Sequence, residues 1–312
     1  MNLLICFSTL LDQVRIEVVD QSLLKLPKRE SIDILKMFLE MSNAKNENSL
    51  NDVETAYFVY KWIGQNIEVD CLGNTFGNSS TLPATIYKEG KGGTIGISAL
   101  FNMICGLLNI ESNTIFGLKK ILSFYNNSLI QIKEYAWNYI SIDNKYYILD
   151  VVSSAGECND NRFYKLQRDK YFGIDPEDSI RVLFPNDKKW QLLSEPITED
   201  KFKSQAYLSE GFFKYFTSIT PDIQTIRNKS EIKIKLTVKD PNIKKLDIMV
   251  SYDAENELPE FCGTDEVSIV NGTCEYTVDF FYTCYTFIDI ADENHNNIGH
   301  ITFETIIDEY EN

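Results

Sequence analysis

The spacing of hydrophobic residues near the start of the chain predicts two helices. Apolar residues recur every three or four positions over residues 31–43, and Ser31 is placed to cap that helix. Asn51 is followed three residues later by Glu54, a capping-box pattern, so a second helix is expected from there to about Ile67. The residues expected on the buried faces are Ile32, Leu35, Phe38 and Leu39 in the first helix, and Val53, Tyr57, Tyr60 and Ile63 in the second.

A third helix and then strands are expected further along the chain. Gly92 and Gly93 allow the backbone to turn before a helix that should begin at Thr94. Its buried face is expected to contain Ile97, Phe101, Ile104 and Leu108. From about Asn113 the hydrophobic period changes to two, which indicates strands. These are expected at residues 114–118, 134–142 and 145–151, the last two joined by a turn at Asp143 and Asn144.

Short strands dominate the C-terminal third. Prolines punctuate residues 171–196, a connector that should be mostly extended. From Phe212 onwards apolar and polar residues alternate, which is typical of half-buried strands. The expected strands are residues 231–238, 245–252, 266–270, 274–281, 285–289 and 298–305. Regularly spaced short strands of this kind indicate an antiparallel sandwich of immunoglobulin-like type.

These patterns predict an α+β chain in two domains. Residues 1–210 are expected to form one domain, with the helices, the first strands and the connector, and residues 211–312 an acidic β-sandwich. The chain has 312 residues, of which 44% are hydrophobic and 24% charged, so it is long enough for two cores and unlike a disordered chain.

The charge is unevenly distributed. Against 30 basic residues the chain has 46 acidic ones, a formal net charge of −16. Residues 219–312 contain 7 basic and 19 acidic side chains, a net of −12, which leaves −4 for residues 1–218. Phosphate backbones and anionic lipids repel such a chain, so nucleic acid and membrane surfaces are not expected as partners. Solubility and attraction of a basic protein partner are the two explanations for the acidic C-terminal region.

The cysteines form no pattern typical of a disulfide framework or a zinc site. They are odd in number, widely spaced and without a C-x-x-C pair, so reduced thiols in the cytoplasm are expected. No apolar run reaches the ~18 residues that span a bilayer. Residues 1–11 are apolar but lack the charged start and cleavage site of a signal peptide, so a buried element is expected there, with a cleaved signal as the alternative. The seven cysteines are Cys6, Cys71, Cys105, Cys158, Cys262, Cys274 and Cys284.

Four motifs resemble those of one protein family. They are residues 92–101 (GGTIGISALF), 134–138 (EYAWN), 142–150 (IDNKYYILD) and 171–198, which begins with Tyr-Phe and ends near Trp-Gln-Leu-Leu. In this order and spacing they resemble the transglutaminase-like superfamily, which has a papain-like cysteine-peptidase fold. The fourth motif resembles the branch of kyphoscoliosis peptidases and cytokinesis proteins. The resemblance covers roughly residues 24–202.

The resemblance implies a catalytic triad that is degenerate in this chain. The family carries a cysteine at a helix N-terminus, a histidine in His-Ala-Trp-Asn and an aspartate at the end of the next strand; the helix dipole and imidazolium activate the thiol. The matching positions are Thr94, Tyr135 and Asp150, which should lie together. The former active-site cleft would comprise Gly93, Thr94, Tyr135, Trp137 and Asp150.

We do not expect another residue of this chain to supply the missing nucleophile or general base. A threonine hydroxyl needs a general base, and an ordinary phenol, with a pKa near about 10, stays protonated at neutral pH. Cys105 lies about 16 Å along the third helix from the family's cysteine position, so it is expected in the core. Cys71 and Cys158 are expected in loops of a domain without histidine, because both histidines, His295 and His300, belong to the C-terminal strands.

We therefore expect a catalytically inactive protein that binds or scaffolds another protein and carries no catalytic residue, cofactor or metal. The resemblance implies a setting around the cytoskeleton or cytokinesis. Two alternatives remain open: an active peptidase, amidase or cross-linking enzyme with an unorthodox nucleophile, and a secreted or surface adhesion protein.

Overall fold

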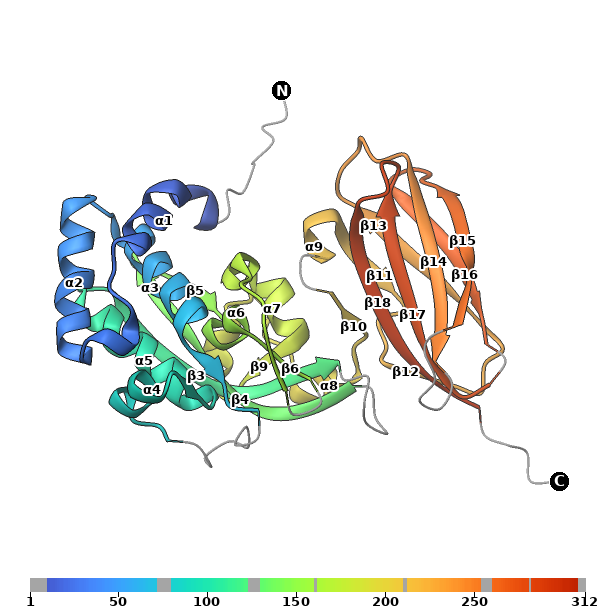
Figure 1. The fold of residues 1–312 in the computed structure, drawn as a ribbon. Helices are drawn as coiled ribbons and strands as arrows, with labels where there is room; N and C mark the ends of the chain where they lie inside the picture. The colour runs from blue at the N-terminus through green and yellow to red at the C-terminus, as the bar shows by residue number, and fades with distance from the viewer. Residues whose placement is uncertain are drawn as a thin grey trace. The chain divides into compact units, whose positions relative to one another are not determined.

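The computed structural model describes residues 10–71, 80–122, 130–159, 162–209, 212–253, 260–280 and 282–307 (Figure 1). Most of residues 1–11 therefore lies outside the described residues. The chain forms two compact units. The first comprises Met1–Leu118, Glu134–Pro176 and Pro185–Leu192, and the second Lys119–Lys133, Glu177–Phe184 and Leu193–Asn312. The units interleave along the chain, and the division between residues 210 and 211 stays a prediction.

Helix α3 (Asp52–Asn66) is the central helix of the first unit. Its side chains are buried continuously from Val53 to Gly64, and α1, α5 and α6 pack against it. The capping box predicted from Asn51 and Glu54 is confirmed, and the helix ends at Asn66 with Ile67 as its C-cap, close to the predicted end. The helical segments of this unit are η1 (Leu10–Gln13), α1 (Ile16–Leu24), η2 (Arg29–Ser31), α2 (Ile34–Glu47), α3, α4 (Pro83–Glu89), α5 (Thr94–Leu107), α6 (Val151–Ala155), η3 (Asp169–Tyr171) and η4 (Lys188–Gln191).

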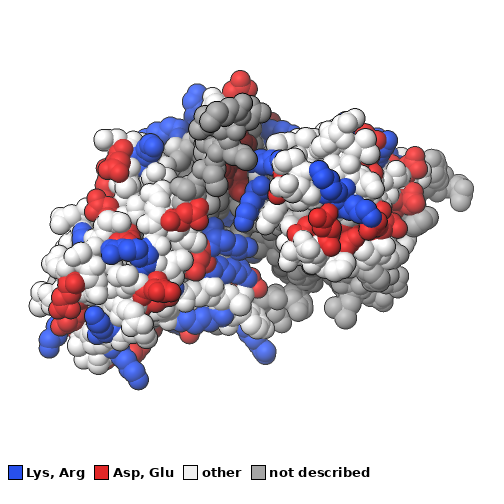
Figure 2. Space-filling model, turned by 90° about the horizontal axis from the view of Figure 1, so that it is seen from above, with Lys and Arg blue, Asp and Glu red and all other residues white. Residues whose placement is uncertain are grey.

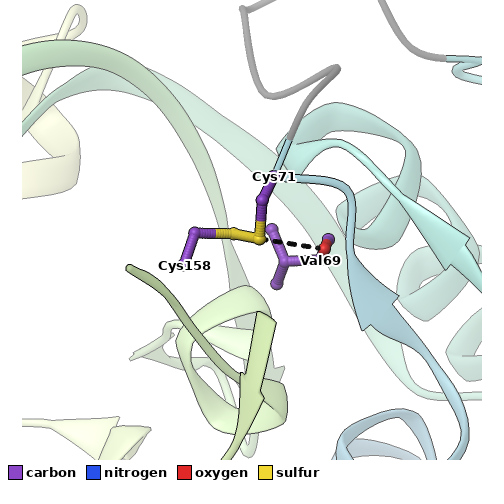
Figure 3. The surroundings of a disulfide bond; sticks show 3 residues. All are labelled: Val69, Cys71 and Cys158. Atoms are coloured by element: carbon purple, nitrogen blue, oxygen red, sulfur yellow. Dashed lines mark hydrogen bonds between the residues drawn. A yellow bond between two sulfur atoms is a disulfide. The ribbon is translucent and has the colours of Figure 1, made fainter. Parts of the chain in front are cut away.

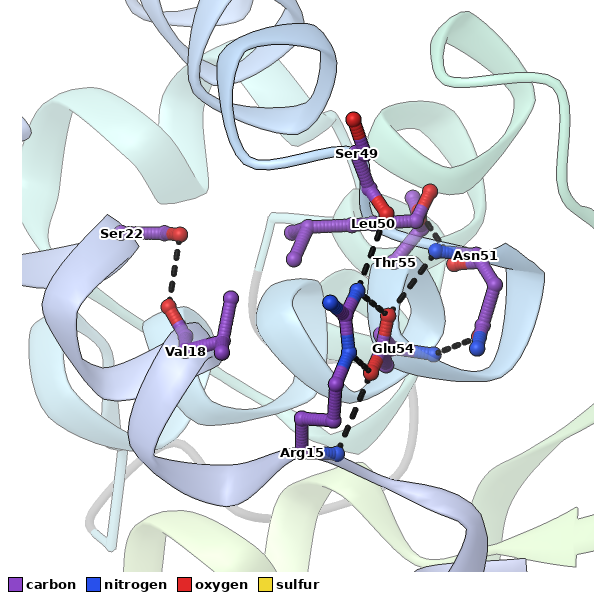
Figure 4. Close-up of polar contacts among 8 residues, drawn as sticks. All are labelled: Arg15, Val18, Ser22, Ser49, Leu50, Asn51, Glu54 and Thr55. Carbon is purple, nitrogen blue, oxygen red and sulfur yellow. Dashed lines mark hydrogen bonds and ion pairs between the residues drawn. The ribbon is translucent and has the colours of Figure 1, made fainter.

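The capping glutamate also anchors the N-terminal segment (Figure 4). The Arg15 side chain donates to Glu54 from Nε at 2.5 Å and from Nη2 at 2.6 Å, and Nη2 also donates to the Ser49 carbonyl at 3.0 Å. The Glu54 residue is fully buried. The hydrogen bond from Arg15 lowers the pKa of Glu54 below its usual value. One buried carboxylate thus joins the start of α1 to the start of α3.

Helix α2 differs from its prediction in start and in buried face. It begins at Ile34, because the Asp33 carboxylate accepts a hydrogen bond from the Lys36 amide at 2.9 Å, whereas the Ser31 hydroxyl bonds back to the Lys28 carbonyl. The buried stripe is Met37, Phe38, Met41 and Ala44. The prediction that Leu35 and Leu39 are buried is wrong, because these residues are 75% and 58% exposed. The helix thus has two apolar stripes, and the one that contains Met37 and Met41 is buried in the core.

One five-stranded sheet has the order β8-β5-β4-β3-β9. The long strands are close to those predicted, and the turn at Asp143 and Asn144 has positive φ at both residues, as a tight hairpin requires. The connector expected to be mostly extended instead contains α7 (Pro176–Val182), with proline and acidic residues in its first turn, as helix starts favour. The strands are β3 (Glu111–Leu122), β4 (Ile130–Ile142), β5 (Lys145–Leu149), β8 (Phe172–Ile174) and β9 (Leu183–Pro185).

Two small ladders complete the first unit. Strand β1 (Glu68–Val69) pairs in parallel with β2 (Lys91–Gly92), and β6 (Gly156–Asn159) pairs antiparallel with β7 (Arg162–Lys165). The predicted third helix is confirmed: α5 begins at Thr94, and Ile97, Phe101, Ile104 and Leu108 are buried.

The second unit contains two sheets that share one core. One has the order β10-β18-β17-β14-β15, with β12 parallel to β18, and the other, β11-β13-β16, is antiparallel. Both contribute buried side chains, for example Ile234 from β13 and Ile288 from β17. The C-terminal antiparallel sheets are confirmed, and the immunoglobulin-like arrangement stays a prediction. The elements are α8 (Glu199–Ser204), β10 (Tyr207–Leu208), α9 (Phe212–Tyr215), β11 (Phe216–Thr220), β12 (Thr225–Arg227), β13 (Glu231–Val238), β14 (Lys245–Asp253), β15 (Glu260–Ser268), β16 (Thr273–Asp279), β17 (Cys284–Asp292) and β18 (Asn297–Ile306).

Within the described ranges, no helix combines the length and apolar composition that a membrane span requires.

Candidate functional site

The start of α5 is shaped by close packing around its glycines. Gly93 is the N-cap in an extended conformation, and Thr94, 7% exposed, is the first helical residue. A Cβ on Gly96 would lie 2.5 Å from the Ser80 carbonyl oxygen, and one on Gly92 would lie 2.5 Å from Ile86 Cδ1. The glycines of this motif therefore allow the segment leading into α4 to lie directly against the first turn of α5.

Asn138 of β4 fixes α5 against the sheet. Its side-chain amide donates to the Ser98 carbonyl at 3.1 Å and to Asn102 Oδ1 at 2.9 Å, and Asn102 in turn donates to the Thr114 hydroxyl at 2.8 Å. Asn138 is fully buried, so these bonds satisfy the amide N–H donors, while its Oδ1 has no hydrogen-bond partner among the described residues. The asparagine of the Tyr-Ala-Trp-Asn motif thus positions the helix that carries Thr94.

Tyr135 and Asp150 are joined by a direct hydrogen bond. The Tyr135 hydroxyl donates to Asp150 Oδ1 at 3.0 Å and lies 3.1 Å from the Ser153 hydroxyl. The same carboxylate oxygen accepts the Ser153 backbone N–H at 2.9 Å, so Asp150 is the N-cap of α6. The structure therefore brings together two of the three triad positions, and adds Ser153 to them.

This hydrogen bond gives Tyr135 the opposite role from a general base. A carboxylate has no proton to donate, so the Tyr135 phenol is the donor in this hydrogen bond and does not act as a proton acceptor toward Asp150. In a cysteine peptidase the imidazole at this position bonds the acid through one nitrogen and accepts the thiol proton through the other. A phenol has a single oxygen and cannot divide these two tasks between two atoms.

A second phenol near Asp150, that of Tyr60, is held protonated. Burial raises the pKa of Tyr60 well above its usual value, and the nearby Asp150 carboxylate raises it further. The Tyr60 hydroxyl donates to the Arg168 carbonyl at 2.6 Å. The Tyr60 phenol is therefore not available as a phenolate.

The described free thiols are buried away from water. Burial raises the pKa of Cys105 far above its usual value and that of Cys274 to about 11, and it also raises the pKa of Cys284. Such thiols stay protonated at neutral pH and are poor nucleophiles. The expectation that Cys105 belongs to the core agrees with its complete burial.

The five residues of the expected cleft are all buried. Trp137 and Asp150 are each 1% exposed, Tyr135 and Thr94 are each 7% exposed, and Gly93 is also buried. The Trp137 indole N–H has no hydrogen-bond partner among the described residues. These five described residues are therefore buried, and one of them, Trp137, carries an unpaired donor.

The expectation of reduced thiols at Cys71 and Cys158 is wrong. These residues form a disulfide across 87 positions of sequence, with Cα atoms 5.5 Å apart (Figure 3). Their spacing in sequence gave no signal, because two cysteines so far apart become neighbours only through the fold. Cys6 lies outside the described residues.

Both histidines lie in the second unit, as the sequence predicted. The His300 Nδ1 atom lies 2.7 Å from Asp289 Oδ1, and its Nε2 lies 2.9 Å from the Thr302 hydroxyl. The His295 Nδ1 atom lies 2.8 Å from an Asp247 carboxylate oxygen. These rings are held by carboxylates of neighbouring strands. In the described residues, no three histidine, cysteine or acidic side chains are placed to hold a metal.

Ser153 is the site residue that sequence reasoning missed. It follows Asp150 by three residues, which is the spacing of an N-cap carboxylate and the amide that it accepts. That spacing is a usable signal for a helix start, whereas the alternating pattern of residues 145–151 predicts that Asp150 belongs to the end of a strand. The strand in fact ends at Leu149, and α6 begins at Val151.

Comparison with known proteins finds a family match for part of the chain and several distant relatives. Residues 40–151 match the Transglutaminase-like superfamily, so the chain contains a domain of that superfamily. It is 24% identical to the kyphoscoliosis peptidase of Mus musculus over 193 residues, 59% of this chain and 29% of that protein. It is 22% identical to Lim and transglutaminase domain protein ltd-1 of Caenorhabditis elegans over 192 residues, 57% and 26% of the two chains.

A third relative is hillarin of Drosophila melanogaster, 22% identical over 230 residues, 67% of this chain and 27% of that protein. The chain thus spans less than a third of the length of these relatives. The resemblance seen in the sequence motifs is confirmed at the level of the superfamily domain and of distant homology to these proteins.

Proposed function

From the transglutaminase-like domain and the geometry of its site, we propose that this protein is a catalytically inactive member of the superfamily that binds or scaffolds another protein. The observation that carries the proposal is the hydrogen bond from Tyr135 to Asp150. It places a phenol, with its proton already committed to the acid, at the position where the family's chemistry needs an imidazole.

Three further features support inactivity. The family's cysteine position is Thr94, whose hydroxyl is a weak nucleophile without a base. The free thiols described above are buried and stay protonated. The residues of the former cleft are almost completely buried, so a substrate amide has little access to them.

The partner is proposed to be a protein with a basic surface, in a cytoskeletal or cytokinesis setting. The setting comes from the resemblance to the cytokinesis-protein branch. The basic surface is inferred from the net charge of −12 in residues 219–312. Figure 2 shows clusters of acidic side chains beside basic ones on the visible surface of the second unit.

An active hydrolase with an unorthodox nucleophile is the second candidate. One observation favours it: the hydroxyls of Tyr135 and Ser153 are 3.1 Å apart, and Tyr135 also contacts Asp150. Serine next to a phenol and an acid is a conceivable nucleophile, although Ser153 is only 8% exposed. The relative named a peptidase gives this alternative its substrate class, amides.

The test is turnover of peptide and glutamine-amide substrates by the parent chain, Thr94→Ala and Ser153→Ala. We expect no turnover above a buffer blank in any of them. Parent turnover that disappears in Thr94→Ala or in Ser153→Ala would replace the proposal with the hydrolase, and the variant that abolishes it would identify the nucleophile. Partner capture by the same three proteins, with thermal unfolding as the folding control, should be equal if the protein acts by binding alone.

A gain-of-function variant sharpens the test. Thr94→Cys combined with Tyr135→His restores two family residues beside an intact Asp150. We expect at most weak activity, because the surrounding side chains no longer support an imidazole. The matched control is Thr94→Cys with Tyr135→Phe, which has the thiol and no imidazole.

A further inference from the structure

The Cys71–Cys158 disulfide connects the two segments that lead into the candidate site. Cys71 lies two residues after β1, and β1 pairs with β2, which ends at Gly92, two residues before Thr94. Cys158 lies in β6, which directly follows α6, the helix capped by Asp150. The bond therefore joins the segment leading to Thr94 with the segment leading from Asp150.

The non-covalent contacts of this region are short. The β1–β2 ladder has two residues a side, with backbone bonds from Glu68 N to Gly90 O at 2.8 Å and from Asp70 N to Gly92 O at 2.9 Å. The β6–β7 hairpin has four residues a side. Ladders of this length are marginal on their own. The two pack against each other, since β1 contacts both β6 and β7.

The two bonded cysteines are less deeply buried than the described free thiols. Cys71 and Cys158 are both half-buried, in contrast to the buried free thiols Cys105, Cys274 and Cys284. Disulfide exchange requires that a thiolate reach one of the two sulfurs, so exposure decides which bonds respond to a reductant.

We propose that the Cys71–Cys158 disulfide is a redox-controlled brace of the candidate site. The site is rigid when the bond is closed and looser when the bond is open. Opening consumes two molecules of a thiol reductant such as glutathione. The first thiolate attacks one cysteine sulfur, which breaks the protein S–S bond and forms a mixed disulfide. The second thiolate attacks the reductant sulfur of that mixed disulfide, so a new S–S bond joins the two reductant sulfurs, and the two protons end on Cys71 and Cys158. Closing is the reverse reaction with a disulfide oxidant.

The brace also connects the site to its compartment. Disulfides persist in oxidising compartments, and the glutathione pool of a reducing compartment opens accessible ones. In the cytoplasm the open form would dominate at rest and oxidation would close it. In a secreted protein the closed form would be permanent. The inference goes beyond the proposed function and does not depend on whether the site has turnover.

Hydrogen exchange on the intact chain tests the local effect. We expect reduction to increase exchange roughly tenfold or more at the amides of Asp70 and Ser153, and to leave β13 amides such as Ile234 unchanged. Equal increases in both units, or no increase near the site, would overturn the proposal. Peptide mapping after trapping thiols with an alkylating agent must also find the 71–158 linked peptide, and its absence in oxidised protein would refute the bond.

Serine variants separate the bond from the two side chains. Cys71→Ser, Cys158→Ser and the double variant should show the same exchange pattern as the reduced parent, and none should respond further to reductant. The matched control is Cys284→Ser, which removes a buried free thiol and should keep the full response to reductant. A double variant looser at the site than either single variant would contradict a role through one shared bond.

Discussion

The two units differ in the burial of the carboxylates that form their main polar contacts. In the first unit Asp150 is 1% exposed and Glu54 is fully buried, and each accepts several hydrogen bonds from its surroundings. In the second unit the carboxylate of Asp289 stays partly exposed beside His300, and Glu275 forms exposed ion pairs with lysines of β13. These two carboxylates of the first unit are therefore part of its core, whereas these two of the second unit are at least partly exposed to solvent.

The two units also differ in the side chain that is hydrogen-bonded to an acid. The first unit keeps the geometry of an acid with a hydrogen-bonded partner but has a phenol, Tyr135, in place of the imidazole. The second unit has an acid, an imidazole and a hydroxyl in a chain from Asp289 through His300 to Thr302, but that threonine is fully buried. The first cluster thus lacks an imidazole, and the second has an imidazole beside a buried hydroxyl. Neither described cluster combines an acid, an imidazole and an accessible nucleophile.

The largest expected effect is from Asp150→Ala. It leaves the Tyr135 hydroxyl and the Ser153 amide without their shared acceptor in a buried position, and should lower the free energy of unfolding by about 3 kcal/mol. Denaturant unfolding measures it. The matched control, Asp289→Ala at the partly exposed pair with His300, should cost no more than roughly 1 kcal/mol. Equal costs at the two sites would remove the distinction between the units.

Lys120 is an exception, because the second unit buries this cation. It is 1% exposed, and its Nζ donates to the Gln205 carbonyl at 2.8 Å. Burial, and then the charge of Arg181, lowers its pKa to about 7, while Asp222 opposes and Lys201 adds to that shift.

The expected consequence is a stability that rises with pH. Between the folded pKa and the ordinary lysine pKa the unfolded chain binds more protons, so raising the pH from about 7.5 to 9.5 should stabilise the fold by roughly 2 kcal/mol through Lys120. Denaturant unfolding at the two pH values gives the slope. Lys120→Met should lose this contribution, and a variant with the parent's slope would contradict the assignment.

A smaller effect is expected from Arg15→Met. It removes the partner of the buried Glu54 carboxylate, which keeps its Asn51 amide, and should lower the free energy of unfolding at pH 7 by less than Asp150→Ala does. The hydrogen bond from Arg15 lowers the folded pKa of Glu54, so its stabilisation is present above the unfolded pKa and is lost as the pH falls through the folded value. The cost of Arg15→Met should therefore be smaller in acid. Unfolding at pH 7 and pH 3 compares the two, and an equal cost would contradict the ion pair.

The sequence predicted the parts of this fold that depend on local spacing. The capping box at Asn51, the start of α5 at Thr94 and the C-terminal strands depend on residues close in the chain. The buried face of α2, the disulfide and the burial of Lys120 depend on which segments meet in space, and single-sequence periodicity contains no such information. At the site, motif order predicted the contact of Tyr135 with Asp150, and the missed Ser153 followed from assigning Asp150 to a strand.

The smallest expected effect concerns two opposed carboxylates on the second unit. Glu231 of β13 is directly opposite Asp279 of β16, and both are exposed. Like charges directly opposite destabilise a strand pair, so Glu231→Gln should stabilise the fold by about 0.3 kcal/mol. If the acidic region attracts a basic partner, the same variant should slow association with that partner more than it changes dissociation, and added salt should reduce the difference. Surface-based binding kinetics at low and physiological salt measure both. A variant more stable than the parent, with unchanged association at either salt, would leave solubility as the reason for the acidic surface.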